Sequence, residues 1–183
     1  MIKKALKYSF KHEKKLANLL KEITKNNLKN EDTSEEVYKK IGSILLDFTV
    51  KTQSVYKKFD LKRDGDEHVE IVSKQLEEIK KWQVKQLEWI NSKEHNDLRK
   101  KSLRQAELKA RNVKGNLYAS FLRKIASKDA DYFIWETVGD DRVRDEHQDR
   151  DQEVFSFKDA DLLPGEDPGC RCWATIILKR EIN

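Results

Sequence analysis

The sequence predicts an α+β fold, in which a mainly helical N-terminal region precedes a small C-terminal domain with a short antiparallel sheet. Apolar residues recur at helical spacing to about residue 127, and no proline breaks this pattern. After Ala130 the pattern changes to strand-like alternation, and the stretch Trp135–Trp173 holds both prolines, both cysteines and three of the six glycines. We therefore predict a basic helical region of about three long helices over residues 1–103. Residues 104–183 should form a C-terminal domain with one helix and about three short strands.

The charge is unevenly distributed. Residues 129–183 carry 7 Lys and Arg against 15 Asp and Glu, whereas residues 1–128 carry 31 against 18. A basic helical part thus precedes an acidic module, which is consistent with solvated helices or with a surface for nucleic acid or an acidic protein. No apolar run approaches the roughly 18 residues of a membrane span, and no leader peptide is apparent. We expect a soluble protein without a membrane partner.

Two amphipathic helices are expected in the first 60 residues. The first extends from about Ile2 to Thr24, and asparagines at positions 26, 27 and 30 should interrupt it. The second begins at the capping box in Thr33-Ser34-Glu35-Glu36. Their inward-facing residues are expected to be Ile2, Leu6, Phe10, Leu16, Leu20 and Ile23 in the first helix, and Val37, Ile41, Ile44, Leu45, Phe48, Val55 and Phe59 in the second.

Two more helices are expected after a turn at Lys62–Asp66. The fourth extends from about Lys93 to Ser127, has a thin apolar face, and is weakened in its middle by Gly115. The tryptophans of the third helix, Trp82 and Trp89, lie at helical spacing among lysines, which favours packing over stacking on nucleic-acid bases. The stripe of the third helix is expected to comprise Val69, Val72, Leu76, Ile79, Gln83 and Ile90, and that of the fourth Leu98, Leu103, Ala106, Ala110, Val113, Leu117, Phe121 and Ile125.

Three short strands are expected at residues 131–138, 153–157 and 172–178. The Pro-Gly pairs at 164–165 and 168–169 fix a long loop before the last strand. The economical arrangement is an antiparallel sheet packed against the end of the fourth helix.

The stretch from Asp140 to Cys172 allows three interpretations. The first is a structural zinc site, because thiolates and imidazole suit zinc and a disulfide between cysteines one residue apart would be strained. Its ligands would be His147, Asp167, Cys170 and Cys172.

The second interpretation is a metal-dependent nucleic-acid enzyme or acid/base pair that uses His147 with nearby acids. The third is purely structural: arginines and His147 pair with acids to hold the loop, and the cysteines behave as small buried hydrophobes. The acids of the second interpretation are Asp140, Asp141, Asp145 and Glu146; the cations of the third are Arg142, Arg144 and Arg171.

A family resemblance follows from the motifs FIWETVGDDRVRDEH, DQEVF and PGCRCW taken in order. Together they resemble the C-terminal domain of the phage Mu F-like minor head (head morphogenesis) proteins, over about residues 104–178. The matching positions are Trp135, Thr137, Asp140, Arg142, Val143, Arg144, His147, Asp151, Phe155, Pro168, Cys170, Arg171 and Cys172.

The chain departs from the family pattern at two places. Gln152 stands where the family usually has glycine, so the turn before Glu153 is expected to be less able to adopt positive φ. Some members have Cys-x-x-Cys where this chain has Arg144 and His147, and arginine cannot ligate a metal. The ligand-like positions that remain are His147, Asp167, Cys170 and Cys172.

The resemblance implies an assembly role and no enzymatic activity. Members are head proteins of low copy number that associate with the portal vertex and packaged DNA. We therefore expect a component of the phage head (the virion), made in the bacterial cytoplasm, with portal or other head proteins as partners and non-specific DNA contact through the basic helices. Portal contact is expected to use the apolar helix faces. No cofactor is expected other than zinc.

Overall fold

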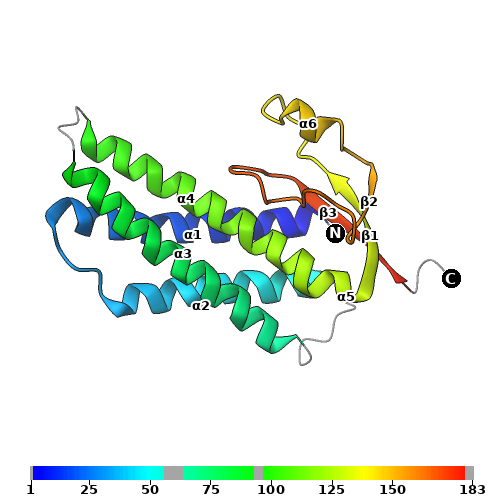
Figure 1. The fold of residues 1–183 in the computed structure, drawn as a ribbon, viewed down its shortest axis with the longest axis horizontal. Helices are drawn as coiled ribbons and strands as arrows, with labels where there is room; N and C mark the ends of the chain where they lie inside the picture. Colours follow the sequence, from blue (N-terminus) through cyan, green and yellow to red (C-terminus); the bar gives the residue numbers. More distant parts are fainter. Residues whose placement is uncertain (1, 56–63, 93–96, 180–183) are drawn as a thin grey trace.

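Four long helices lie side by side along the length of the protein, and a small sheet lies at one end (Figure 1). This computed structural model describes residues 2–55, 64–92 and 97–179, without the side chains of residues 2–10 and 55. The helices are α1 (Ile2–Lys29), α2 (Glu35–Val55), α3 (Gly65–Asn91) and α4 (Leu98–Phe121), followed by the π-helical turn η1 (Leu122–Ala126) and the short α5 (Ser127–Asp129).

The sheet has three antiparallel strands in the order β2-β1-β3. Its strands are β1 (Ala130–Glu136), β2 (Val154–Ser156) and β3 (Trp173–Leu178), and the short helix α6 (Asp145–Gln148) lies between β1 and β2. The predicted α+β class is confirmed, and all three predicted strands are present, each end within two residues of its predicted position. The sequence did not indicate α6.

The first helix is longer than predicted. It continues through Asn26 and Asn27 to Lys29 and ends at Asn30, whose φ of 55° is left-handed. The Glu31 N–H donates to Asn26 O at 2.9 Å and the Asn30 N–H to Asn27 O at 3.2 Å, the pattern of a Schellman cap.

Asn27 explains why the expected interruption fails. Its side chain is 2% exposed and donates to Gln86 Oε1 of α3 at 3.2 Å. Thr24 donates to the same oxygen at 3.1 Å. Hydrogen bonds to a neighbouring helix thus override the weak helix propensity of asparagine.

The buried stripe of α3 also differs from the prediction. Val69 is 56% exposed, whereas Ile71 is 1% exposed. The buried face includes the polar residues Gln75 and Gln86, so the helix is rotated relative to the predicted stripe, which was set mainly by apolar residues. Trp82 packs against the core as expected. The predicted positions Ile2, Leu6, Phe10, Val55, Phe59, Lys62 and Lys93 lie outside the described side chains.

One hydrophobic cluster joins the helices to the sheet. It extends from Leu16 of α1 through Leu117 of α4 to Phe133 and Trp135 of β1. The predicted division between residues 103 and 104 lies inside α4, and it stays a prediction about sequence organisation. In the part of the chain that the structure describes, no helix is long and apolar enough to cross a membrane.

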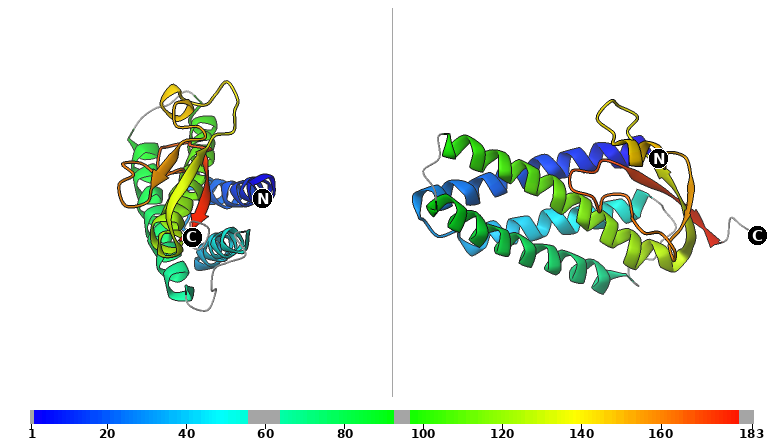
Figure 2. Two further views of the ribbon diagram at one scale, coloured as in Figure 1. Left: turned by 90° about the vertical axis from the view of Figure 1, so that its right-hand side faces the viewer. Right: turned by 45° about the horizontal axis from the view of Figure 1, so that its top comes forward.

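The long loop between β2 and β3 returns along α4 (Figures 1 and 2). A Cβ added to Gly115 of α4 would lie 2.5 Å from Gly165 O, and one added to Gly165 would lie 2.6 Å from Gly115 O. The two backbones are therefore in direct contact, which only glycine at both positions allows. Gly115 thus serves a packing role.

We predict that Gly115→Ala destabilises the protein by about 1 to 2 kcal/mol. Overpacking costs about 1 to 3 kcal/mol, and alanine's higher helix propensity offsets up to about 1 kcal/mol. Urea unfolding followed by circular dichroism measures the difference. Gly65→Ala is the matched control, because nothing lies within 4 Å of an added Cβ there. Equal or higher stability of Gly115→Ala would contradict the close contact.

Candidate functional site

His147, Cys170 and Cys172 come together beneath the loop that precedes β3. His147 lies on α6, and the cysteines lie on the last turn of the loop before β3. The exposed fractions are 3% for His147 and 6% for each cysteine. Both cysteines are free thiols.

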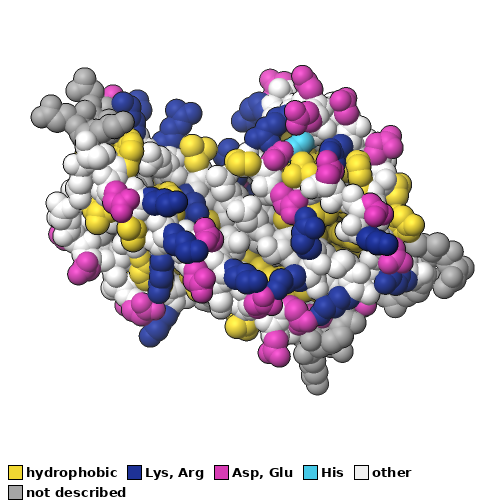
Figure 3. All heavy atoms as spheres, viewed as in Figure 1, with side chains coloured by type: hydrophobic (Ala, Val, Ile, Leu, Met, Phe, Trp, Pro, Cys, Tyr) yellow, Lys and Arg dark blue, Asp and Glu magenta, His cyan; other side chains and the backbone are white. Residues whose placement is uncertain are grey.

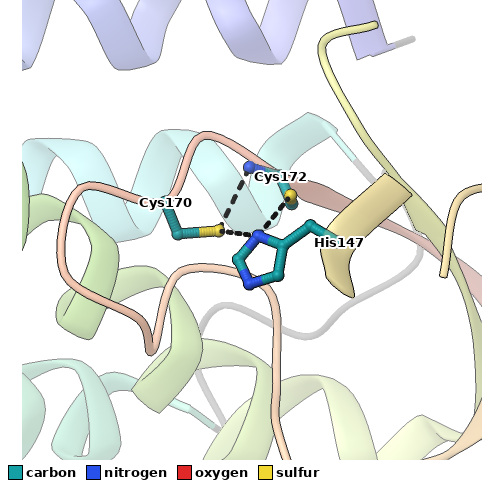
Figure 4. A group of neighbouring side chains, drawn as sticks. All are labelled: His147, Cys170 and Cys172. Carbon is teal, nitrogen blue, oxygen red and sulfur yellow. Dashed lines mark hydrogen bonds between the residues drawn. The ribbon is translucent and has the colours of Figure 1, made fainter. Parts of the chain in front are cut away.

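The imidazole Nδ1 faces both sulfurs (Figure 4). It lies 3.7 Å from Cys170 Sγ and 3.4 Å from Cys172 Sγ. One ligand atom from each of these three residues lies within 4.8 Å of the others. Among the described residues, this is the group of His, Cys, Asp or Glu side chains that could hold a metal ion.

Asp167 is on the other side of the ring. Its Oδ2 lies 2.8 Å from His147 Nε2. A carboxylate can only accept this hydrogen bond, so Nε2 carries the proton and, in the neutral ring, Nδ1 presents its lone pair to the sulfurs. Arg144 holds Asp167 in turn, through a 3.5 Å contact with Oδ2 and a 2.5 Å bond to Pro168 O. The sequence grouped Asp167 with the ligands, whereas the structure places it against the back of the histidine.

The two thiols influence each other. The contact between the sulfurs lowers the pKa of Cys170 and raises the pKa of Cys172. The backbone N–H groups of Cys172 and Gly165 point at Cys170 Sγ and also lower the pKa of Cys170. The Trp135 indole N–H, which has no other partner among the described residues, acts on Cys172 in the same direction. Polar hydrogens thus surround the sulfurs.

An ion pair ties the other end of the loop to the turn after β1. Arg171 donates to both oxygens of Asp140, at 2.6 and 2.5 Å. This bidentate bond holds the pKa of Asp140 well below its usual range, with a smaller contribution from the backbone N–H of Arg142. Arg142 is exposed; its backbone N–H donates to Asp140 Oδ1 at 3.2 Å and its Nη2 to Oδ2 at 3.4 Å.

The remaining motif residues support the strand between these two ties. Asp151 accepts the Thr137 N–H at 2.7 Å. Trp135 is fully buried, with Phe155 and His147 edge-on to its ring at 6.0 and 5.4 Å. The structural interpretation of these residues therefore rests on direct contacts. Val143 lines the cavity beside His147, and its backbone N–H donates to Asp140 O at 3.1 Å.

The turn before β2 corrects one expectation. Gln152 adopts φ of 66°, so the left-handed conformation is kept without glycine. The Gln152 N–H donates to Trp135 O at 2.8 Å and the Trp135 N–H to Glu153 O at 2.9 Å. These two bonds to β1 require the turn whatever residue occupies position 152.

The acids proposed for catalysis are not gathered around His147. Asp140 is bound by Arg171, and the metal-type group contains no carboxylate. Asp141, Asp145 and Glu146 are exposed. Sequence reasoning assigned no contact to Asn112, which accepts the Gly169 N–H at 2.9 Å, or to Tyr118, whose hydroxyl accepts the Ala174 N–H at 3.0 Å. The sequence of a helix does not show which loop will lie against it.

The fold and the site define a helical scaffold with a small, internally tied C-terminal module. The family model described as Phage Mu protein F like protein matches residues 64–175, which is more than half of the chain, and the protein belongs to that family. This confirms the resemblance and extends it to α3. The family indicates a protein of phage head morphogenesis. Neither the curated proteins nor the solved structures gave a match.

We predict that Gln152→Gly raises the free energy of unfolding by about 0.5 to 1 kcal/mol. A left-handed residue with a Cβ carries roughly 1 to 2 kcal/mol of strain, and the extra freedom of unfolded glycine cancels part of the gain. Gln152→Ala is the control, because it keeps the Cβ and loses only the 3.3 Å contact with Glu136. Chemical denaturation of both variants measures the effect, and a gain in Gln152→Ala equal to that in Gln152→Gly would contradict the prediction.

We predict that Asp140→Asn destabilises the protein at neutral pH and that the deficit shrinks in acid. A carboxylate with a lowered folded-state pKa contributes its stability above the unfolded pKa, near 3.8, and loses it as the pH falls toward the folded value. Urea unfolding at pH 7 and at about pH 3 to 4 compares variant with wild type. Asp159→Asn, at an exposed position of the loop between β2 and β3, controls for loss of charge. A deficit independent of pH would exclude the ion pair as its source.

Proposed function

We propose that the protein is a minor head protein of a phage or prophage that is incorporated during head assembly and contacts the portal or another head protein. The observation that carries this proposal is the family match over residues 64–175, which includes α3, α4 and nearly the whole C-terminal module. Assembly would take place in the bacterial cytoplasm, and the product would stay in the virion.

The partner surface has to use exposed positions of the bundle. The apolar faces of the helices, expected from sequence to contact the portal, pack against one another in the core. Large exposed hydrophobic side chains remain at Val84 of α3, at 57%, and Leu108 of α4, at 47%. A stable contact would bury on the order of 800 Å² on each partner, so these side chains would be part of a larger and mostly polar surface.

DNA contact would be weak and non-specific. On the face shown in Figure 3, Lys and Arg alternate with Asp and Glu without a continuous basic area. Several lysines are engaged in ion pairs, such as Lys81 with Glu78 at 2.8 Å and Lys74 with Glu70 at 2.9 Å. Paired lysines release few counterions on binding phosphate, which favours protein partners over DNA as the main contact.

The enzymatic alternative has no support in the geometry of the described residues. His147 Nε2 contacts Asp167, and its Nδ1 faces the two cysteines. Both ring nitrogens are therefore already engaged by neighbouring side chains. A structural role therefore fits this histidine better than general base catalysis.

The test is incorporation into heads. Phage particles produced with a tagged chain should contain it in few copies per head, and the chain should co-purify with the portal protein encoded by the same phage. Val84→Glu combined with Leu108→Glu should reduce co-purification without lowering the melting temperature. Val154→Glu, at an equally exposed position on β2, is the control.

Absence of the chain from purified particles, together with normal heads in a deletion mutant, would refute the proposal. DNA binding is tested separately by titration with duplex DNA at about 50 and 200 mM salt, where non-specific binding should fall steeply. Hydrolysis of DNA or RNA with added divalent metal, lost in His147→Ala, would instead support the enzyme.

A further inference from the structure

The distances between the buried side chains of His147, Cys170 and Cys172 are close to those between the ligands of a zinc ion. In a tetrahedral zinc site with Zn–S of about 2.3 Å and Zn–N of about 2.05 Å, the nitrogen and each sulfur are about 3.6 Å apart. The observed distances from Nδ1 are 3.7 Å to Cys170 Sγ and 3.4 Å to Cys172 Sγ. These two distances match the nitrogen–sulfur edges of such a tetrahedron, and all three atoms lie within 4.8 Å of one another.

We propose that His147 Nδ1, Cys170 Sγ and Cys172 Sγ bind one Zn²⁺, with Asp167 as the carboxylate that orients the histidine and not as a ligand. Thiolate and imidazole donors select zinc over the harder divalent cations. Binding requires both thiols to lose their protons, and the two thiolates balance the charge of the ion.

The hydrogen bond on the far nitrogen supports this assignment. Metal-bound histidines commonly donate their other ring N–H to a carboxylate, which fixes the tautomer and the orientation of the ring. The 2.8 Å contact between His147 Nε2 and Asp167 Oδ2 is this arrangement. Arg144 Nη1 contacts the same carboxylate oxygen at 3.5 Å.

The surroundings suit bound thiolates. The backbone N–H of Cys172 lies 3.4 Å from Cys170 Sγ. The Trp135 indole N–H is fully buried next to His147 and has no conventional acceptor among the described residues. A buried donor without an acceptor is costly, and a thiolate with negative charge gives it one.

The fourth ligand would be a water molecule from the adjacent cavity. A cavity of about 100 Å³ opens beside the three ligands and is lined also by Arg142, Arg144 and Arg171. It is large enough for water, and its lining contains no carboxylate that could serve as a fourth protein ligand or as a general base. The ion would tie α6 to the end of the loop that precedes β3.

The experiment measures metal content and stability on the full chain, purified without chelator under reducing conditions. Elemental analysis should give about one zinc per chain. A strong chelator should lower the melting temperature, and added Zn²⁺ should restore it with saturation at one equivalent. Co²⁺ added to the metal-free protein should give the visible absorption and the thiolate charge-transfer bands of tetrahedral coordination.

Two variants separate a metal centre from a cluster of buried hydrophobes. Cys170→Ala with Cys172→Ala keeps small apolar side chains; it should bind no zinc, and its melting temperature should not respond to chelator. Asp167→Asn keeps all three ligands and should still bind one zinc, with an affinity reduced about 10- to 100-fold.

Purified wild type with less than about 0.1 zinc per chain, no rise in melting temperature with Zn²⁺ and no Co²⁺ spectrum would overturn the proposal. Loss of stoichiometric zinc in Asp167→Asn would instead make Asp167 a ligand and refute its assigned role. Each outcome is independent of whether the protein enters phage heads, so the proposed function is tested separately.

Discussion

The close approach of Gly165 to Gly115 is the constraint on which the C-terminal module depends. It allows the loop backbone to lie directly on α4, where Asn112 can accept the Gly169 N–H. From there the chain passes His147 before β3 begins, and the buried side chain of Cys170 faces the imidazole. A side chain at either glycine would lift the loop, and the sulfurs would move away from the imidazole. A helix position that lowers helix propensity is therefore what sets the geometry of the site.

The fold was predictable where one local pattern decides the structure. Helical spacing and the change of period at Ala130 identify the four helices and the three strands, because burying an apolar face is the dominant contribution to the stability of each element. The predictions are wrong where polar contacts between elements determine where a helix ends or which of its faces is buried. Asn27 keeps α1 helical by bonding to Gln86, and the buried Gln75 and Gln86 rotate α3 so that Val69 faces solvent. Neither effect is visible before the partner helix is placed.

The site was predictable as a set of residues but not as an arrangement. The ligand chemistry of thiols and imidazole grouped His147, Cys170 and Cys172, and the structure adds that the imidazole meets the cysteines with one nitrogen and Asp167 with the other. Spacing in sequence cannot distinguish these two sides of a ring, because the choice depends on how α6 is oriented over Trp135. Gln152 shows the opposite case: two hydrogen bonds to β1 impose a left-handed turn that its side chain disfavours.

A three-stranded sheet of this size needs support from outside its own ladder. β2 has only three residues and pairs only with β1 in the described sheet, so strand pairing alone would hold it weakly. Support comes from the helices, with which Phe133 shares a buried core, and from the loop, which lies on α4. The loop is tied at its end by Arg171 to Asp140 and in its middle by the glycine contact. The His147 cluster lies near these two contacts. Specific contacts at separated points thus hold this acidic segment, which has few apolar residues, in one conformation while its surface stays polar.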